Sequence, residues 1–240
     1  MKVQTALYLI PVEISEQSVE NAIPAGNMQI VNELRVFIVE NLRTARRALR
    51  RWNRSFPIDE CTFYELNDHT PAQEIPSYLD ALRRGESVGV MSEAGCPAVA
   101  DPGADVVAIA QSEGLKVVPL VGPSSIILSL MASGFNGQGF AFNGYLPVRD
   151  EERTRALKDL EERCRRLGQT QIFIETPYRN NRLIASLAAT LRPDTLVCVA
   201  CDISDPDKES IVTLPAAKWK HNKTDYDKRP AIFLMHRQQK

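Results

Sequence analysis

The sequence predicts an α/β protein with a largely parallel sheet, divided into two α/β domains. Short apolar runs rich in β-branched residues alternate with stretches of helical periodicity, which is typical of parallel strands joined by helices. A turn containing Pro119 and the Gly122-Pro123 pair interrupts this alternation near mid-chain, directly after a complete strand. We therefore expect an N-terminal α/β domain over residues 1–119 and a C-terminal α/β domain over residues 120–240.

Each expected element has either an apolar β-rich run or a helical period of apolar residues. The expected strands are 5–10, 36–40, 87–91, 116–120, 171–175, 195–200, 210–213 and 231–235. The expected helices are 42–53, 74–84, 104–112, 126–132, 151–167 and 182–191. The last strands are short and follow one another closely, so we expect the C-terminal sheet to be mixed.

Composition limits the classes of function. The chain has 29 Lys and Arg against 30 Asp and Glu, for a net charge of −1, which excludes a generally basic protein that coats nucleic acid but allows a local basic patch. Its five scattered cysteines indicate free thiols in a reducing compartment, so we expect a cytoplasmic protein. No apolar run approaches the roughly 18 residues of a membrane-spanning helix.

Small residues follow the expected strand 87–91, in the segment Ser92-Glu93-Ala94-Gly95-Cys96-Pro97, and Asp101-Pro102-Gly103 comes next. In open α/β sheets, ligands bind at the carboxyl ends of strands, and small residues let them approach the backbone closely. A tight turn is the alternative interpretation, with Asp101 and Pro102 capping the next helix. We interpret Gly95-Cys96-Pro97 as a ligand loop and Asp101-Pro102 as the cap.

A second loop, Gly122-Pro123-Ser124-Ser125, also follows a strand and begins an apolar helix. Its hydroxyl groups and the N–H groups of the helix start suit a carboxylate or a ribose. An ordinary serine N-cap explains the same residues equally well, and both interpretations stay open.

Six arginines with spacings of three and four share one face of the expected helix 42–53 and its continuation. They are Arg43, Arg46, Arg47, Arg50, Arg51 and Arg54. No acidic residue lies between Asn41 and Ile58, whereas a solvated helix face normally mixes charges. Because the planar guanidinium suits phosphate, we expect this face to contact an RNA backbone, with a purely solvated face as the alternative.

The remaining polar motifs are weaker. Asp68 and His69, in Asn67-Asp68-His69-Thr70, could act as an acid/base pair, but a capped loop is the favoured interpretation. Cys198 and Cys201 are three apart in a strand, point to opposite faces and are interpreted as core residues. The sequence has no metal-ligand cluster, nucleophile elbow, P-loop or dinucleotide-binding glycine motif, so we expect no metal.

In this order, the loops resemble the tetrapyrrole methylase superfamily (class III) of S-adenosylmethionine (SAM) dependent methyltransferases. The most similar branch is that of the bacterial 16S ribosomal RNA 2′-O-ribose cytidine methyltransferases. Nearly the whole chain is covered, and two matches are specific. Residues 92–97 with 101–103 correspond to S-D-A-G-T-P…D-P-G, and residues 117–124 correspond to V-V-P-L-P-G-P-C. Weaker matches are 143–147 to G-F-L-P, 67–69 to H-D-H, 175–179 to E-S-x-x-R and 40–43 to E-D-T-R.

The resemblance implies a SAM pocket in a cleft between two α/β domains, a homodimer and no metal ion. The residues that it places at the pocket are Ile14, Ser92, Ala94, Gly95, Cys96, Val99, Ser124, Ser125, Glu175, Ala200, Pro230 and Ala231. The motifs leave the catalytic residues open, with Arg43, Asp68, His69 and Arg179 as candidates. Methyl transfer of this kind is an in-line displacement, to which the protein contributes chiefly positioning and desolvation.

The first loop departs from the resembled pattern P-x-P-I-G-N-L. Pro11-Val12-Glu13-Ile14 is followed by Ser15, and Gly26-Asn27 comes eleven residues after Ser15. Glu93, Cys96 and Asn41 also replace the Asp, Thr and Asp of the resembled motifs. These changes leave the expectation of SAM in place and weaken that of the substrate.

Three functions therefore stay open at the level of sequence. The first is methylation of a ribosomal RNA ribose, with the small ribosomal subunit as partner. The second is SAM-dependent methylation of a small molecule of the tetrapyrrole kind or of a protein side chain. The third is a homologue that binds SAM or RNA without catalysis.

Overall fold

The computed structural model describes residues 4–15 and 19–237, so part of the segment between Glu13 and Asn27 lies outside the described residues. The chain forms two compact units, residues 1–124 and 125–240. This division lies between Ser124 and Ser125, shortly after the boundary expected at Pro119. Among the described residues, no helix is both long enough and apolar enough to cross a membrane.

The first unit is built on a five-stranded sheet of order β3-β2-β4-β1-β5, in which every neighbouring pair is parallel. Its strands are β1 Leu7–Ile10, β2 Val36–Val39, β3 Thr62–Glu65, β4 Val88–Met91 and β5 Val117–Pro119. Its helices are α1 Val19–Ala22, α2 Ala25–Val31, α3 Leu42–Trp52, α4 Asp80–Arg83 and α5 Ala104–Ser112, with short 3₁₀ turns at Ile58–Glu60 and Ile75–Leu79.

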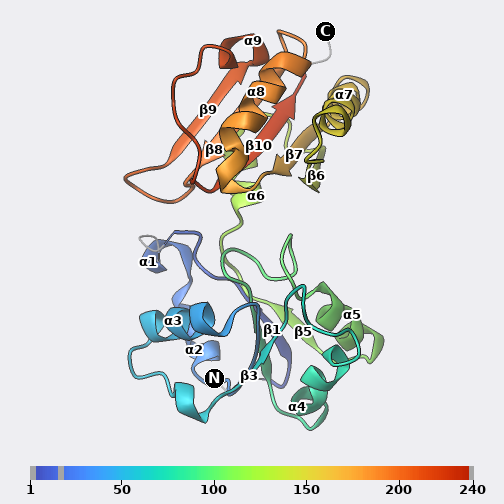
Figure 1. Ribbon diagram of the computed structural model, residues 1–240. Helices are drawn as coiled ribbons and strands as arrows, with labels where there is room; N and C mark the ends of the chain where they lie inside the picture. The colour runs from blue at the N-terminus through green and yellow to red at the C-terminus, as the bar shows by residue number, and fades with distance from the viewer. Residues whose placement is uncertain (1–3, 16–18, 238–240) are drawn as a thin grey trace. The chain divides into compact units, whose positions relative to one another are not determined.

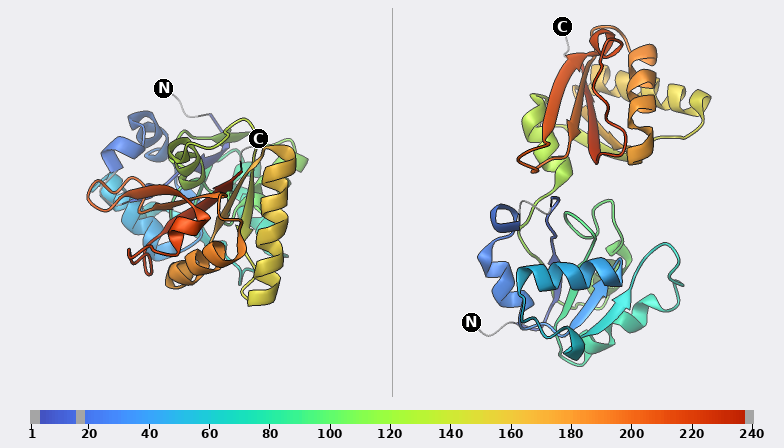
Figure 2. Two further views of the ribbon diagram at one scale, coloured as in Figure 1. Left: turned by 90° about the horizontal axis from the view of Figure 1, so that it is seen from above. Right: turned by 60° about the vertical axis from the view of Figure 1, so that its left-hand side comes forward.

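Both faces of the first sheet are buried, because helices cover each of them. One apolar cluster joins α2 and α3 to side chains of β1 and β2, including Leu49 and Phe37. A second cluster joins α4 and α5 to the opposite face, including Leu82 and Val106. Figure 2 shows α3 lying along its face of the sheet. Since all five strands are parallel, their carboxyl ends meet at one edge, where ligands bind in sheets of this kind.

The second unit has a mixed five-stranded sheet of order β6-β7-β10-β8-β9. Only β6 and β7 pair in parallel, while β10 pairs antiparallel with β7 and β8, and β8 with β9. Its strands are β6 Phe140–Tyr145, β7 Thr170–Ile174, β8 Leu196–Cys201, β9 Ser210–Pro215 and β10 Ala231–His236. Its helices are α6 Ser125–Ser133, α7 Asp150–Leu167, α8 Asn180–Thr190 and α9 Ala216–Trp219, with a 3₁₀ turn at Pro177–Arg179.

The helices of the second unit are divided unevenly between the faces of its sheet (Figure 1). Side chains of α7, α8 and α9 form one core with Phe173 and Phe233. On the other face, α6 packs through Ile126 and Leu130 onto β7, β8 and β10. One face of the sheet is therefore covered by the single short helix α6, and the opposite face by the three helices α7, α8 and α9.

The predicted fold class and all eight predicted strands are confirmed, with strand bounds within two residues. The single helix expected over 74–84 is wrong: a 3₁₀ turn beginning at Ile75, with Pro76 in its first positions, precedes the short helix α4. Strands β3 and β6 were not expected. Both are sheet edges, and none of their residues is fully buried, so they lack the continuous apolar run of an inner strand.

Candidate cofactor site

Three loops of the first unit meet at the carboxyl ends of β1, β4 and β5. We call them the first loop (residues 11–15), the glycine loop (residues 92–97) and the Gly-Pro loop (residues 121–124). Strand β1 pairs with β4 on one side and with β5 on the other, so the three loops leave the sheet side by side. The topology thus places beside the first loop two segments that follow it in the chain by about 80 and 110 residues.

Backbone hydrogen bonds fasten the first loop to the glycine loop. The N–H of Val12 donates to the Gly95 carbonyl at 2.9 Å, and the N–H of Gly95 donates to the Val12 carbonyl at 2.9 Å. Gly95 has φ +73°, in the left-handed region that side-chain-bearing residues rarely adopt. A Cβ on Gly95 would meet only the Pro123 carbonyl, at 3.8 Å, so the space above its Cα is open to a ligand.

The glycine loop also contacts the Gly-Pro loop. The Cys96 thiol donates to the Pro123 carbonyl at 3.3 Å. Burial raises the pKa of Cys96, and the nearby Asp101 charge raises it further, so the thiol stays protonated and keeps this hydrogen bond at neutral pH. Cys96 thus fills, with a weaker donor, the position of a threonine hydroxyl in the resembled motif.

The Gly-Pro loop lies directly against the first loop. A Cβ on Gly122 would stand 2.2 Å from the Cβ and 2.6 Å from the Cγ of Pro11, a distance that only glycine permits. The buried Asn27 side chain, at the start of α2, donates to the Val121 carbonyl at 2.8 Å. Sequence reasoning missed Pro11, Gly122 and Asn27 as supports of the site; the displaced Gly26-Asn27 pair was the signal that could have identified Asn27.

The segment after the glycine loop is held in an unusual backbone conformation. Ala98 and Ala100 have φ +66° and +65°, and Gly103 has φ +125°. For the two alanines such conformations cost of order 1–3 kcal/mol each, and strained residues of this kind cluster at functional sites. The expected helix cap is wrong, because Gly103 is the residue before α5 and the side chain of Asp101 does not cap that helix.

Carboxylates gather beside the glycine loop. Glu40, after β2, accepts a hydrogen bond from the Glu93 N–H at 3.1 Å. Burial raises the pKa of Glu40, and the charges of Asp101, Glu93 and Asp68 raise it further against that hydrogen bond. Burial likewise raises the pKa of Asp101, with a hydrogen bond from Ser92 opposing it and the Glu93 charge adding to it. This edge of the sheet therefore repels further negative charge.

An acidic groove of about 430 Å³ lies between the loop after β3 and the start of α5, lined by Asp68, Asp101 and Asp105 among others. The expected catalytic candidate His69 does not line it. Asn67 accepts a hydrogen bond from the His69 N–H at 3.0 Å and donates its own N–H to the Thr70 hydroxyl at 3.0 Å. The quartet 67–70 is thus a self-bonded turn in which Asp68 and His69 are both exposed.

The second unit brings together the other expected cofactor residues. Ile174 of β7 pairs with Ile232 of β10, which also pairs with Ala200 of β8. Glu175 follows β7, and Pro230 directly precedes Ala231, the first residue of β10. The Pro230 carbonyl accepts a hydrogen bond from the Asp202 N–H at 2.9 Å. The expected cofactor residues of the second unit beyond Ser125 therefore lie at the same end of three adjacent inner strands, β7, β10 and β8.

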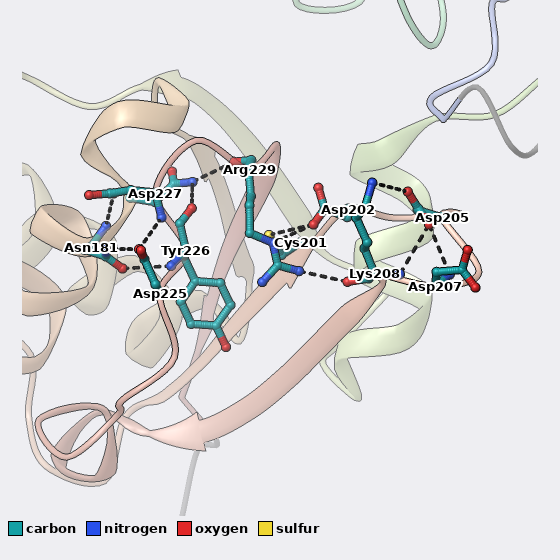
Figure 3. Close-up of polar contacts among 11 residues, drawn as sticks. Asn181, Cys201, Asp202, Asp205, Asp207, Lys208, Asp225, Tyr226, Asp227 and Arg229 are labelled. Atoms are coloured by element: carbon teal, nitrogen blue, oxygen red, sulfur yellow. Dashed lines mark hydrogen bonds and ion pairs between the residues drawn. The ribbon is translucent and has the colours of Figure 1, made fainter.

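A polar network holds the chain that leads into Pro230 (Figure 3). The Arg229 guanidinium donates to Asp202 at 2.6 Å and to the Lys208 carbonyl at 2.8 Å, and it lies 5.7 Å from the ring centroid of Tyr226. Asn181 donates its backbone N–H to Asp227 at 2.9 Å. This network fixes the entry to β10 from several directions.

Glu175 and Arg179 bind each other. Arg179 donates to one Glu175 oxygen through Nε at 3.0 Å and through Nη2 at 2.6 Å, and the same oxygen accepts the Thr176 N–H at 2.7 Å. The Glu175 side chain is 4% exposed. The candidate catalytic role of Arg179 thus competes with a structural role in shaping the turn after β7.

Helix α3 carries the expected cationic face. Asn41 caps it by accepting the N–H groups of Arg43 and Thr44, and Glu65 accepts the Leu42 N–H at 2.9 Å. Ala45, Ala48 and Leu49 are buried. The exposed arginines of the helix are Arg43, Arg46, Arg47, Arg50 and Arg51, of which Arg46 lies 5.3 Å from the ring centroid of Phe63.

Two of the six arginines do not fit the expected face. Arg54 lies beyond the end of α3, because the backbone of Asn53 is extended. The carbonyl of Arg54 accepts a hydrogen bond from the Arg50 side chain at 2.8 Å. Arg51 forms an ion pair with Glu13, a residue 38 positions earlier. The sequence predicted that the arginines have no acidic partner within the helix, and the partner of Arg51 comes from outside it, in the first loop.

The known proteins similar to this chain agree in family. The model of the family described as "Tetrapyrrole (Corrin/Porphyrin) Methylases" matches residues 22–218. The "Ribosomal RNA small subunit methyltransferase I" of Vibrio cholerae is 28% identical over 233 residues, which cover 96% of this chain and 76% of that protein.

Solved structures share the fold over nearly the whole chain. The crystal structure of the methyltransferase CobJ matches with a TM-score of 0.64 at 14% identity, covering 96% of this chain and 93% of that one. Uroporphyrin-III C-methyl transferase from Thermus thermophilus, complexed with S-adenyl homocysteine, matches with a TM-score of 0.57 at 17% identity, covering 96% and 97%. At these identities the likeness concerns the fold alone.

Proposed function

Because the chain belongs to the tetrapyrrole methylase family, we propose that it transfers the methyl group of SAM to a ribose 2′-hydroxyl of ribosomal RNA. The family makes it a SAM-dependent methyltransferase. The observation that carries the RNA substrate is the exposed arginine row of α3, in a chain whose Vibrio relative is named for the small-subunit ribosomal RNA. The proposal places the protein in the cytoplasm, beside the ribosomal subunit.

The glycine loop fits a SAM contact through its backbone. Gly95 exposes its Cα to open space, and the loops on either side hold its φ of +73° by hydrogen bonds to Val12 and from Cys96. The other residues proposed to contact SAM belong to both units. In the first unit they are Ile14, Ser92, Ala94, Cys96, Val99 and Ser124, and in the second unit they are Ser125, Glu175, Ala200, Pro230 and Ala231. When bound there, SAM would supply an activated methyl group: the 2′-hydroxyl oxygen would take the methyl carbon and release its proton to solvent, and S-adenosylhomocysteine would leave.

The arginines of α3 supply the RNA contact in this proposal. Arg43, Arg46, Arg47 and Arg50 are exposed and recur every three or four residues, so several can meet successive phosphates at once. Their guanidinium groups bind phosphate oxygens in pairs without reading the bases. The face therefore orients a folded RNA rather than selecting its sequence.

A homodimer is part of the proposal. The exposed large apolar side chains of the second unit include two on α6, Ile127 and Met131, and two on the edge strand β6, Phe140 and Tyr145. Met131 is 73% exposed, so burying it in a two-fold interface would remove apolar surface from water. Light scattering should give twice 26.8 kDa for the wild type and a lower mass for Met131→Asp. A wild-type monomer at micromolar concentration contradicts the dimer.

The acidic groove supports a second candidate, methylation of a cationic protein side chain or a small molecule. Asp68, Asp101 and Asp105 attract a cation and repel phosphate. The two candidates separate in one experiment, in which labelled SAM is incubated with purified small ribosomal subunits, with a protein extract or with a metabolite extract. Label that appears in the ribosomal RNA with the wild-type protein and is lost with the Gly122→Ala variant supports RNA methylation. Label found only in protein or metabolites overturns RNA methylation in favour of the second candidate.

A further inference from the structure

Glu13 is a buried carboxylate for which the proposed function has no use. Its side chain is 2% exposed and lies in the first loop. One carboxylate oxygen accepts the indole N–H of Trp52 at 2.9 Å, and the other forms the ion pair with Arg51. Both partners stand at the end of α3, so Glu13 joins the first loop to the helix that carries the arginine row.

The carboxylate of this ion pair is buried, while the Arg51 side chain is 32% exposed. Taking a carboxylate out of water costs several kcal/mol, and apolar residues of similar size often replace buried ion pairs without loss of stability, so the pair is weak evidence of a purely stabilising role. Partial burial lowers the pKa of Arg51, because the charged guanidinium loses part of its hydration there. The best-attested use of a buried pair is to select one arrangement of the chain, because it is satisfied only in that arrangement.

The residue next to Glu13 in the chain is bound directly to the glycine loop. Val12, its neighbour, exchanges both backbone hydrogen bonds with Gly95, and Pro11 lies against Gly122. The resembled motif has proline at the position of Glu13, and a proline ring fixes φ by its covalent structure. In this chain the ring is absent, and the carboxylate of Glu13 contacts Arg51 and Trp52 instead.

We propose that Glu13 is a positioning residue for SAM. Its contacts with Arg51 and Trp52 hold the first loop so that Val12 presents Gly95 in its ligand-binding conformation. This inference rests on the proposed role of the glycine loop in binding SAM. It also links the arginine row to the cofactor loops, since Arg51 belongs to the same helix.

Glu13→Gln and Arg51→Lys test the proposal, with Glu33→Gln as the matched control because Glu33 is an exposed carboxylate of the same unit. SAM affinity is measured by calorimetry, thermal stability by melting, and backbone mobility by hydrogen exchange of the peptide that contains Gly95. Glu13→Gln should bind SAM at least ten-fold more weakly and exchange the Gly95 region faster. Arg51→Lys, which keeps the charge, should lose no more than about three-fold, and Glu33→Gln should match the wild type.

Glu13→Gln that melts earlier but binds SAM within two-fold of the wild type overturns the proposal, because a merely structural residue behaves in that way. If Glu13→Gln does not fold, Trp52→Phe decides, since it removes only the indole hydrogen bond; unchanged SAM affinity in that variant also overturns it. Gly122→Ala separates the two levels of inference. If it too binds SAM normally, the assignment of the cofactor loops fails; if it loses SAM while Glu13→Gln does not, only the role of Glu13 fails.

Discussion

Gly122→Ala should weaken SAM binding by on the order of 100-fold while the protein remains folded. The new Cβ would lie 2.2 Å from the Cβ of Pro11, and ordinary contact begins at 3.4 Å, so the two loops must separate by about 1.2 Å. Overpacking of this size costs about 1–3 kcal/mol of stability. A displacement of about 1 Å in a site of this kind costs on the order of 100-fold in function. SAM binding should therefore fall much further than stability does.

Calorimetric titration with SAM and thermal melting give the two quantities. At about 2–4 °C per kcal/mol for a chain of this size, the melting temperature should fall by roughly 2–12 °C. Gly26→Ala is the matched control, because nothing lies within 4 Å of its added Cβ and Gly26 stands in helix α2. Gly122→Ala with SAM affinity within three-fold of the wild type would refute the convergence of the first loop and the Gly-Pro loop on the cofactor.

Further predictions concern the glycine loop, the arginine row and the buried carboxyl. Gly95→Val should abolish detectable SAM binding in calorimetry, since φ +73° is strained for any side chain and worst for a β-branched one; affinity within a few-fold of wild type would contradict it. Replacing Arg46, Arg47 and Arg50 with glutamine should flatten the slope of log affinity for RNA against log salt by about 2 to 3 units, at roughly 0.9 per phosphate, without changing SAM affinity; an unchanged slope means a solvated face. Burial raises the pKa of Asp101, so the folded state binds its proton more tightly than the unfolded state, and ionisation destabilises the fold as the pH rises above the ordinary value of 3.8. Asp101→Asn should accordingly melt above the wild type at pH 7 and lose that advantage as the pH approaches 4; an advantage independent of pH would argue against a raised pKa.

Sequence patterns predicted the elements that are buried on both faces and missed those at edges. Strand β4, with all four residues buried, reads as an apolar run whatever surrounds it. Strand β3 has Thr62 and Glu65 exposed at its ends and becomes a strand only because β2 offers it a parallel partner. Such pairing depends on the assembled sheet, and no local window of sequence contains it.

The candidate site divides in the same way. The glycine loop and the Gly-Pro loop could be proposed as candidate ligand loops from the sequence, because small residues directly after a strand are a local signal. The Glu13 contact with Arg51 and the Asn27 contact with Val121 join residues 38 and 94 positions apart, so neither could be read from spacing. The arginines of α3 show how a prediction from local spacing fails. Helical periodicity grouped Arg51 with its neighbours, whereas in the structure Arg51 pairs with Glu13 of the first loop.

The contacts of Val12 with Gly95 and of Asn27 with Val121 fix both ends of the stretch between Ser15 and Pro24. Both contacts are made by residues outside the stretch, so the loops beside it keep their places through Val12, Gly95, Asn27 and Val121 alone. Chimaeras that exchange the residues between Ser15 and Pro24 with those of relatives should consequently leave the affinity for SAM as it was.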